Sequence, residues 1–147
     1  NQGPVFMDSC VEFFFTPGTD LEKGYFNLEM NCGGTMLFHH QKKPRTDQVW
    51  TSEDHIRQVA VAHTMPEIVD PEMVGDTTWI VEYSIPFSIL GEYHSFSSPE
   101  AGTEWRANFY KCADKTSHPH WLTWSPIDFP RPNFHLPEFF GTLEFQD

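Results

Sequence analysis

The sequence is poor in basic residues and contains no long apolar run. Lysine and arginine together number 9 against 21 aspartate and glutamate residues, which gives a formal net charge of −12. Because the acids are spread along the whole chain, they repel phosphate backbones and anionic membrane surfaces. No stretch approaches the roughly 18 consecutive apolar residues of a membrane-spanning helix. The sequence therefore predicts no nucleic-acid partner and no membrane insertion.

Cysteines are few, and the common catalytic motifs are missing. The three cysteines, Cys10, Cys32 and Cys112, allow at most one disulfide and have no CxxC spacing. The chain also lacks the GxSxG elbow of serine hydrolases and the HExxH motif of zinc proteases. A disulfide framework, a zinc knuckle and a familiar nucleophile are therefore not predicted. The cysteines fit best as small buried apolar side chains.

Aromatic residues, in contrast, are abundant. They make up 16% of the 147 residues, with 14 Phe and 5 Trp, which is more than a minimal core needs. We expect most of them in the core and some on the surface. The length predicts a single domain over residues 1–147.

Alternation of apolar and polar residues predicts short strands along most of the chain. Residues 87–90 could form a single helical turn, and the prolines between residues 113 and 137 predict a loop. The pattern indicates an all-β fold, an antiparallel, jelly-roll-like β-sandwich. The predicted strands cover residues 9–15, 25–31, 35–40, 57–64, 77–85, 104–112 and 141–146, the first two forming a hairpin that turns at 18–24.

The polar sides of these strands are rich in planar groups that form hydrogen bonds. Amide, carboxylate and guanidinium groups of this kind pair well with the equatorial hydroxyls of a sugar. An ordinary solvated sheet face is the alternative. The set consists of Glu12, Tyr25, Asn27, Glu29, Asn31, Arg106, Asn108 and Tyr110.

Histidines raise the possibility of a transition-metal site. His39 and His40 are adjacent and would point to opposite faces of a strand, whereas His118 and His120 could point the same way. A zinc site needs further ligands at a suitable spacing, and none of the usual spacings occurs. The candidates for a third ligand are Asp114, His135 and Glu138.

The same segment, "SHPHWLTW", carries Trp121 and Trp124 in a proline-stiffened loop. The C–H face of a pyranose ring packs on indole, and a rigid loop lowers the ordering cost of binding. We expect one of these tryptophans to be buried and the other exposed, with His120 touching a ligand hydroxyl.

A pair of carboxylates offers a catalytic alternative. Glu12 and Glu29 lie on neighbouring predicted strands, at a separation of about 5 to 10 Å that glycoside hydrolases use. The sequence supplies no further sign of a cleft or of an acid with a raised pKa. A glycan-processing enzyme is therefore the second hypothesis.

Four segments together resemble the family 9 carbohydrate-binding modules, specifically the family 9-like branch. They are "GPVFMDSCVEFFF", "YFNLEMNCGGTML", "WRANFYKCADKTSHPHWLTWSPI" and "PNFHLPEFFGTLEF". The similarity covers most of the chain, and the order of the four motifs is more specific than any one of them.

The resemblance implies a non-catalytic β-sandwich that binds mono- or oligosaccharides between two aromatic side chains, often with structural calcium. It places the first aromatic wall at Phe6, where the family commonly has Trp, and a hydrogen-bonding carboxylate at Glu12. The second wall would be Trp121 or Trp124, with Glu29 or Asn31 on the neighbouring strand.

The resemblance also implies a role in polysaccharide degradation outside the cytoplasm, in an extracellular or periplasmic (secreted) setting. Modules of this kind normally have several strands before the segment that opens this chain, so we expect that the natural protein has an N-terminal segment before Asn1.

Overall fold

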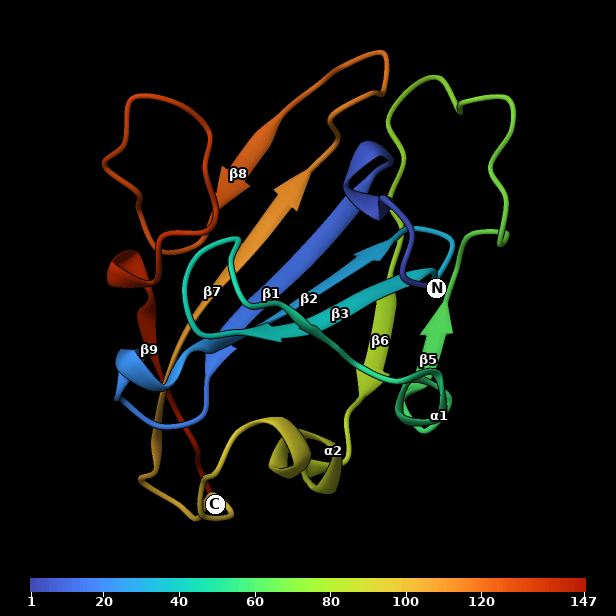
Figure 1. Ribbon diagram of the computed structural model, residues 1–147. Coiled ribbons are helices and arrows are strands. Elements are labelled where there is room, and N and C mark those ends of the chain that lie inside the picture. The colour runs from blue at the N-terminus through green and yellow to red at the C-terminus, as the bar shows by residue number, and fades with distance from the viewer.

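One large antiparallel sheet forms the centre of the molecule in a computed structural model that describes all 147 residues (Figure 1). Its strand order is β4-β3-β2-β1-β7-β8, and β9 also pairs with β7; β5 and β6 form a separate two-stranded sheet. The strands are β1 (Cys10–Thr16), β2 (Tyr25–Asn31), β3 (Met36–Gln41), β4 (Val49–Trp50), β5 (Ala60–His63), β6 (Val81–Ser84), β7 (Glu104–Cys112), β8 (Trp121–Thr123) and β9 (Gly141–Glu144). The helices are η1 (Val5–Met7), η2 (Leu21–Lys23), α1 (Glu53–Ile56), α2 (Phe87–Tyr93) and η3 (Pro137–Phe139).

The fold is an antiparallel β-sandwich, as the sequence predicts. The predicted hairpin is confirmed, because β1 pairs with β2 from Cys10↔Asn31 to Phe15↔Phe26. On its other side β1 pairs with β7. The two strands whose sequences alternate most clearly, β2 and β7, therefore lie on either side of β1.

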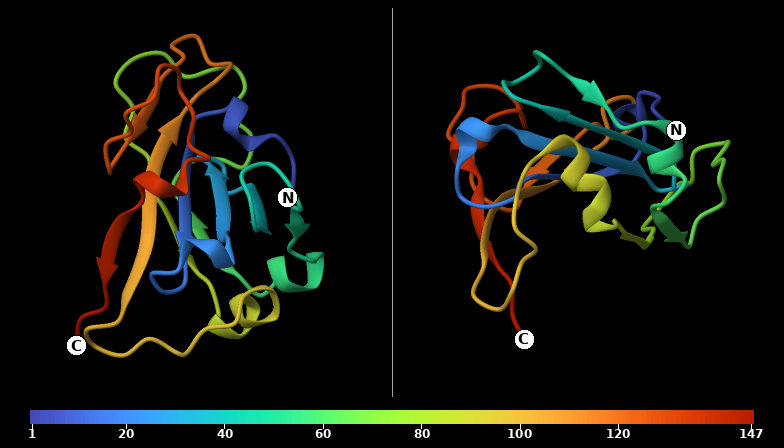
Figure 2. Two further views of the ribbon diagram at one scale, coloured as in Figure 1. Left: turned by 60° about the vertical axis from the view of Figure 1, so that its left-hand side comes forward. Right: turned by 60° about the horizontal axis from the view of Figure 1, so that its bottom comes forward.

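The apolar side chains of the central strands form one face of the large sheet and its core. Phe15 stacks on Phe26 at 5.1 Å and on Trp105 at 5.7 Å between ring centroids. Ile89 and Leu90 of α2 belong to the same cluster, and Val81 and Tyr83 of β6 pack against it. The small sheet and α2 therefore form the second layer of the sandwich, on the side of the large sheet opposite η1 (Figure 2).

Residues 113–137 are not entirely loop, so that prediction is wrong in part. Trp121–Thr123 form β8, which pairs with the end of β7 through Cys112↔Trp121 and Tyr110↔Thr123. β8 is an edge strand of three residues between Pro119 and Pro126, a position that proline-flanked segments tolerate.

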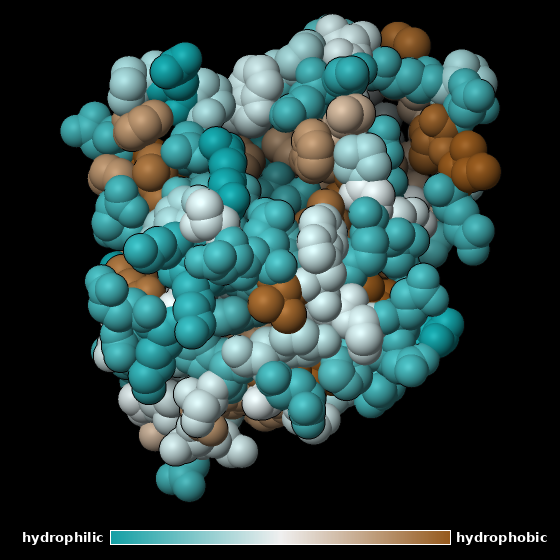
Figure 3. Space-filling model, in the orientation of Figure 1, coloured by the Kyte–Doolittle hydropathy of each residue, from teal (hydrophilic) through white to brown (hydrophobic).

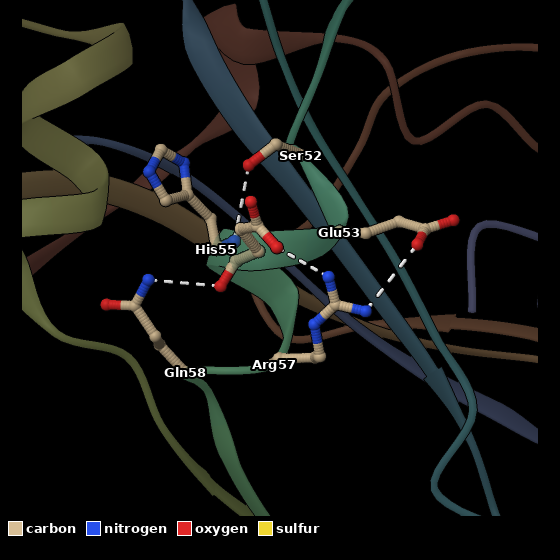
Figure 4. Close-up of polar contacts among 6 residues, drawn as sticks. Ser52, Glu53, His55, Arg57 and Gln58 are labelled. Carbon is tan, nitrogen blue, oxygen red and sulfur yellow. Dashed lines mark hydrogen bonds and ion pairs between the residues drawn. The ribbon is translucent and has the colours of Figure 1, made fainter.

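The short helix α1 was not predicted either. Ser52 caps it, because its hydroxyl accepts a hydrogen bond from the backbone N–H of His55 at 3.2 Å. Arg57 pairs with Glu53 at 3.7 Å on the solvent side (Figure 4). Such capping stabilises a single turn, which is too short to show a helical period in the sequence.

The face of the molecule seen in Figure 3 is mostly hydrophilic, with a hydrophobic patch at the upper right. The loop between β5 and β6 contributes strongly exposed Ile68 and Val74. The longest helix, α2, has only seven residues, and no helix is long and apolar enough to cross a membrane.

Candidate functional site

The polar face of the large sheet is buried under loops. Glu12, Glu29, Asn27 and Asn108 are each at most 6% exposed. The alternative of an ordinary solvated sheet face is therefore wrong. Side chains from distant segments cover the strands here, among them Phe134, which stacks on Tyr110 at a centroid distance of 4.2 Å. Burying so many polar groups is costly unless they are paired or serve a ligand.

A cavity of about 280 Å³ lies between this face and the loops. Of the residues that the sequence singles out for ligand binding, it brings together Phe6, Glu12, Glu29 and Trp121. The complete lining consists of Phe6, Glu12, Glu29, Arg45, Cys112, Asp114, Trp121, Pro132, Asn133, Phe134 and His135.

Two aromatic side chains of the cavity are held by a shared neighbour. The indole N–H of Trp121 donates a hydrogen bond to Asp114 Oδ1 at 2.7 Å. The backbone N–H of Asp114 in turn donates to the carbonyl of Phe6 at 3.1 Å. Asp114 thus fixes Phe6 and Trp121 to the same part of the cavity rim.

Glu12 and Glu29 are direct cross-strand partners in β1 and β2. Burial raises the pKa of Glu29 to about 7, although the hydrogen bond from the Asn27 amide at 3.0 Å opposes this shift. Burial and the neighbouring Glu29 carboxylate raise the pKa of Glu12 as well. Glu29 Oε2 is buried and has no hydrogen-bond partner in the protein.

Two cysteines lie beside Glu12 on the same face. Cys10 and Cys112 are cross-strand partners in β1 and β7, and both are free, buried thiols. The Cys112 thiol lies 3.0 Å from Glu12 Oε1 and donates to it. The hydrogen bond between the Cys10 and Cys112 thiols raises the pKa of Cys10 and lowers the pKa of Cys112.

The cavity lining also contains Arg45 and His135, which the sequence did not assign to sugar binding. His135 Nδ1 accepts hydrogen bonds from the Tyr25 hydroxyl at 2.8 Å and the Gln41 amide at 3.1 Å. Burial and nearby Arg45 lower the pKa of His135 to about 3. Arg45 lies in the segment "QKKPRTD", the only cluster of basic residues in the sequence, and His135 lies in the motif "PNFH". No pattern in the sequence indicates that the two residues meet.

Arg106 and Asn108 do not line the cavity. An Arg106 N–H donates to the carbonyl of Phe140. The Asn108 amide donates to Thr123 Oγ1 and to the carbonyl of Ser125, both at 3.0 Å, and its oxygen accepts from the Ser125 N–H at 2.8 Å. Both side chains therefore attach loops to β7 and are unavailable to a ligand in the cavity.

Asn31 and His120 lie elsewhere, in the lining of a second cavity of about 1120 Å³ next to the 65–77 loop. The Asn31 amide donates to Asp8 at 2.9 Å. His120 Nε2 accepts from Lys111 Nζ at 3.0 Å, and its Nδ1 lies 2.8 Å from the carbonyl of His118. The structure thus places these two predicted residues away from the cavity that holds Phe6 and Trp121.

Trp124 is also outside that cavity. Its ring packs edge-on against Phe109 at 5.8 Å and lies directly over Gly141, where a Cβ would come within 2.6 Å of the indole. Trp121 is 44% exposed and Trp124 53%, so the expectation that one of them is buried is wrong. Of the two candidates, Trp121 is the one in the cavity.

Metal ligands come together in one place. His118 and His120 find no converging third ligand, whereas Cys10, Glu12 and Cys112 have potential ligand atoms within 4.8 Å of one another. This set contains two sulfurs and does not suit calcium, which prefers oxygen. No trio of carboxylates converges in this way, and structural calcium stays a prediction without assigned ligands.

Comparison with known proteins agrees with the β-sandwich and with sugar recognition. The model of "Carbohydrate-binding family 9" matches residues 1–145. A crystal structure from Bacteroides uniformis, of a protein to which carbohydrate binding has been ascribed, superposes with a TM-score of 0.88 at 37% identity. That match covers 99% of this chain and 65% of the other, and no curated protein matches. These findings support non-catalytic carbohydrate binding over an enzyme.

Proposed function

The chain belongs to carbohydrate-binding family 9, and we propose that its cavity binds the terminal one or two units of an oligosaccharide. Phe6 and Trp121 supply the apolar contacts to the sugar ring. Glu12, Glu29 and Arg45 supply hydrogen bonds to its hydroxyls. The domain over residues 1–147 acts by binding alone.

The main support for this proposal is that Phe6 and Trp121 line one small cavity together with two buried carboxyl groups. Aromatic faces pack against the C–H faces of pyranose rings. Carboxyl groups and guanidinium supply acceptors and donors in one plane, which hydroxyl pairs on a sugar require. The residues thus offer both kinds of contact that a sugar needs within one site.

The unpaired oxygen of Glu29 supports this assignment. Glu29 Oε2 is buried without a partner, and a buried acceptor without a partner weakens the fold by about 1 to 3 kcal/mol. A sugar hydroxyl that donates to this oxygen would remove that penalty on binding.

The size of the cavity favours a short ligand. Its volume of about 280 Å³ lies just below the roughly 300 to 1,000 Å³ usual for small-molecule sites. A long polysaccharide segment needs an open groove, whereas a cavity of this size accommodates a chain end. Affinity should therefore stop rising once the oligosaccharide exceeds about two units.

The setting of the domain follows from this role. We propose that it acts outside the cytoplasm, attached to or serving a system that degrades polysaccharides. Bound structural calcium, which the family resemblance implies, belongs to this proposal too.

The test is calorimetric titration with mono-, di- and tetrasaccharides, followed in parallel by tryptophan fluorescence. We expect Trp121→Ala to weaken binding by roughly 30-fold, about 2 kcal/mol, as for other central aromatic contacts. Trp124→Ala is the matched control, because its ring is similarly exposed but lies outside the cavity.

Two outcomes would contradict the proposal. Equal affinities of the two tryptophan variants and the unaltered protein would exclude the cavity as the sugar site. Release of new reducing ends from the oligosaccharides would show that the Glu12 and Glu29 pair is catalytic.

A further inference from the structure

Next to the cavity, two thiols and a carboxyl group converge. Cys10 and Glu12 project from the same face of β1, and Cys112 faces Cys10 from β7. One potential ligand atom from each of the three lies within 4.8 Å of the others, and all three residues are buried. Strand pairing fixes this arrangement, so it needs no loop to close around it.

The combination of donor atoms is that of a zinc site. Zn²⁺ binds thiolate sulfur at about 2.3 Å and carboxylate oxygen at about 2.0 to 2.2 Å, in tetrahedral geometry. Donor atoms around one tetrahedral zinc therefore lie about 3.3 to 3.8 Å apart. The observed separations, 3.0 Å between Cys112 Sγ and Glu12 Oε1 and at most 4.8 Å for every pair, are close to these values.

Charge provides a second, independent argument. Glu29, 5% exposed, faces Glu12 across β1 and β2, and its Oε2 has no protein partner. Neither Glu12 nor Glu29 forms an ion pair with a lysine or arginine, since the ion pairs of the molecule all involve Arg57. The Lys111 amine donates to the carbonyl of Cys112 and to His120. Two carboxyl groups beside two thiols thus have no direct ion-pair partner in the protein, and a divalent metal would provide one.

We propose that Cys10, Glu12 and Cys112 bind one Zn²⁺ ion at the edge of the cavity. On binding, each thiol and the protonated Glu12 carboxyl group lose their protons to solvent, so that two thiolates and one carboxylate coordinate the metal. Glu12 and Cys112 also line the cavity, so a water molecule or a ligand hydroxyl can reach the remaining coordination position. The inference concerns the metal and does not depend on sugar binding.

The experiment uses the full natural chain, purified under reducing conditions and stripped of metal with a chelator. Zn²⁺ alone is titrated against a chromophoric competitor, and Co²⁺ is added to a second sample. We expect one equivalent of Zn²⁺, release of protons, and a thiolate-to-cobalt charge-transfer absorption in the near ultraviolet.

Three variants test the ligands. Cys10→Ser, Cys112→Ser and Glu12→Gln should each weaken zinc binding by more than the roughly 10- to 100-fold that loss of an outer-shell partner costs. Cys32→Ser is the matched control, because Cys32 is a free cysteine outside the cluster. It should leave the affinity and the cobalt spectrum unchanged.

The proposal is overturned if the reduced protein binds no stoichiometric zinc, or if Cys10→Ser binds it as tightly as the unaltered chain. A Cys10–Cys112 disulfide that persists in reductant, seen by mass spectrometry, overturns it as well. Should a serine variant not fold, the cobalt spectrum of the unaltered protein decides, because only thiolate ligands give that absorption. Sugar titrations with and without zinc keep the two proposals separate.

Discussion

The two faces of the large sheet are buried to a similar degree but by different chemistry. On one face Phe26, Leu28 and Met30 are each 0% exposed in an apolar core. On the other, Asn27 and Glu29 of the same strand are 1% and 5% exposed beneath loops that leave a cavity. Apolar burial stabilises by itself, whereas each buried polar group depends on a partner. The first face can therefore hold the fold while the second is free to recognise a ligand.

The largest effect should come from the apolar face. Phe26→Ala removes a ring that contacts Phe15 and Phe38, and we expect it to lower the free energy of unfolding by about 3 to 5 kcal/mol. Urea denaturation measures the loss. Sugar affinity of the remaining folded protein should stay unchanged. A variant with normal stability and weakened binding would reverse the division between the faces.

A smaller loss should follow on the polar face. Asn108→Ala leaves Ser125 and Thr123 without their amide partner, and unpaired buried groups of this kind cost about 1 to 3 kcal/mol. Because Asn108 is outside the cavity, binding should weaken only through misplacement of the loop. The measurement is denaturation together with calorimetric titration. An affinity loss as large as that of Trp121→Ala, at unchanged stability, would show that Asn108 contacts the sugar.

The third effect appears only in acid. The pKa of His135 falls from 6.5 to about 3, so below pH 6.5 the unfolded chain takes up a proton that the folded one refuses. The neutral imidazole therefore contributes its full stability above pH 6.5, and this contribution is lost as pH falls toward 3. His135→Asn keeps an acceptor for the Tyr25 hydroxyl but cannot titrate.

We expect the stability difference between the two proteins to shrink between pH 6.5 and 4. Denaturation curves at several pH values measure it. The other buried groups with shifted pKa values, His39 and His40 at about 4 and the raised Glu12 and Glu29, are common to both proteins and cancel in the difference. Parallel stability profiles would mean that His135 titrates normally in the fold.

The apolar face was predictable because strand alternation is a local property. The alternation in residues 104–112 predicts both ends of β7 and places Trp105 and Arg106 on opposite faces of the sheet. The pattern of residues 25–31 does the same for β2. In each case the neighbouring residues carry all the information that the prediction needs.

The polar face was only half predictable. The sequence identified its side chains but not the loops that bury them, because contacts between residues such as Tyr25 and His135, 110 positions apart, leave no periodic signal. The same limit explains the tryptophans. Spacing suggested one buried ring, whereas β8 at the sheet edge leaves both partly exposed.

The link through Asp114 joins segments that are far apart in the chain, since Phe6 and Trp121 belong to opposite ends of the sequence. No fragment that lacks either end can form the cavity. A ligand held there therefore binds the native state alone and raises its stability by RT ln(1 + [L]/Kd), about 2.7 kcal/mol at a hundred times the dissociation constant. Ligand binding in the cavity would thus report complete folding, since the site forms only when the first and last parts of the chain are packed together.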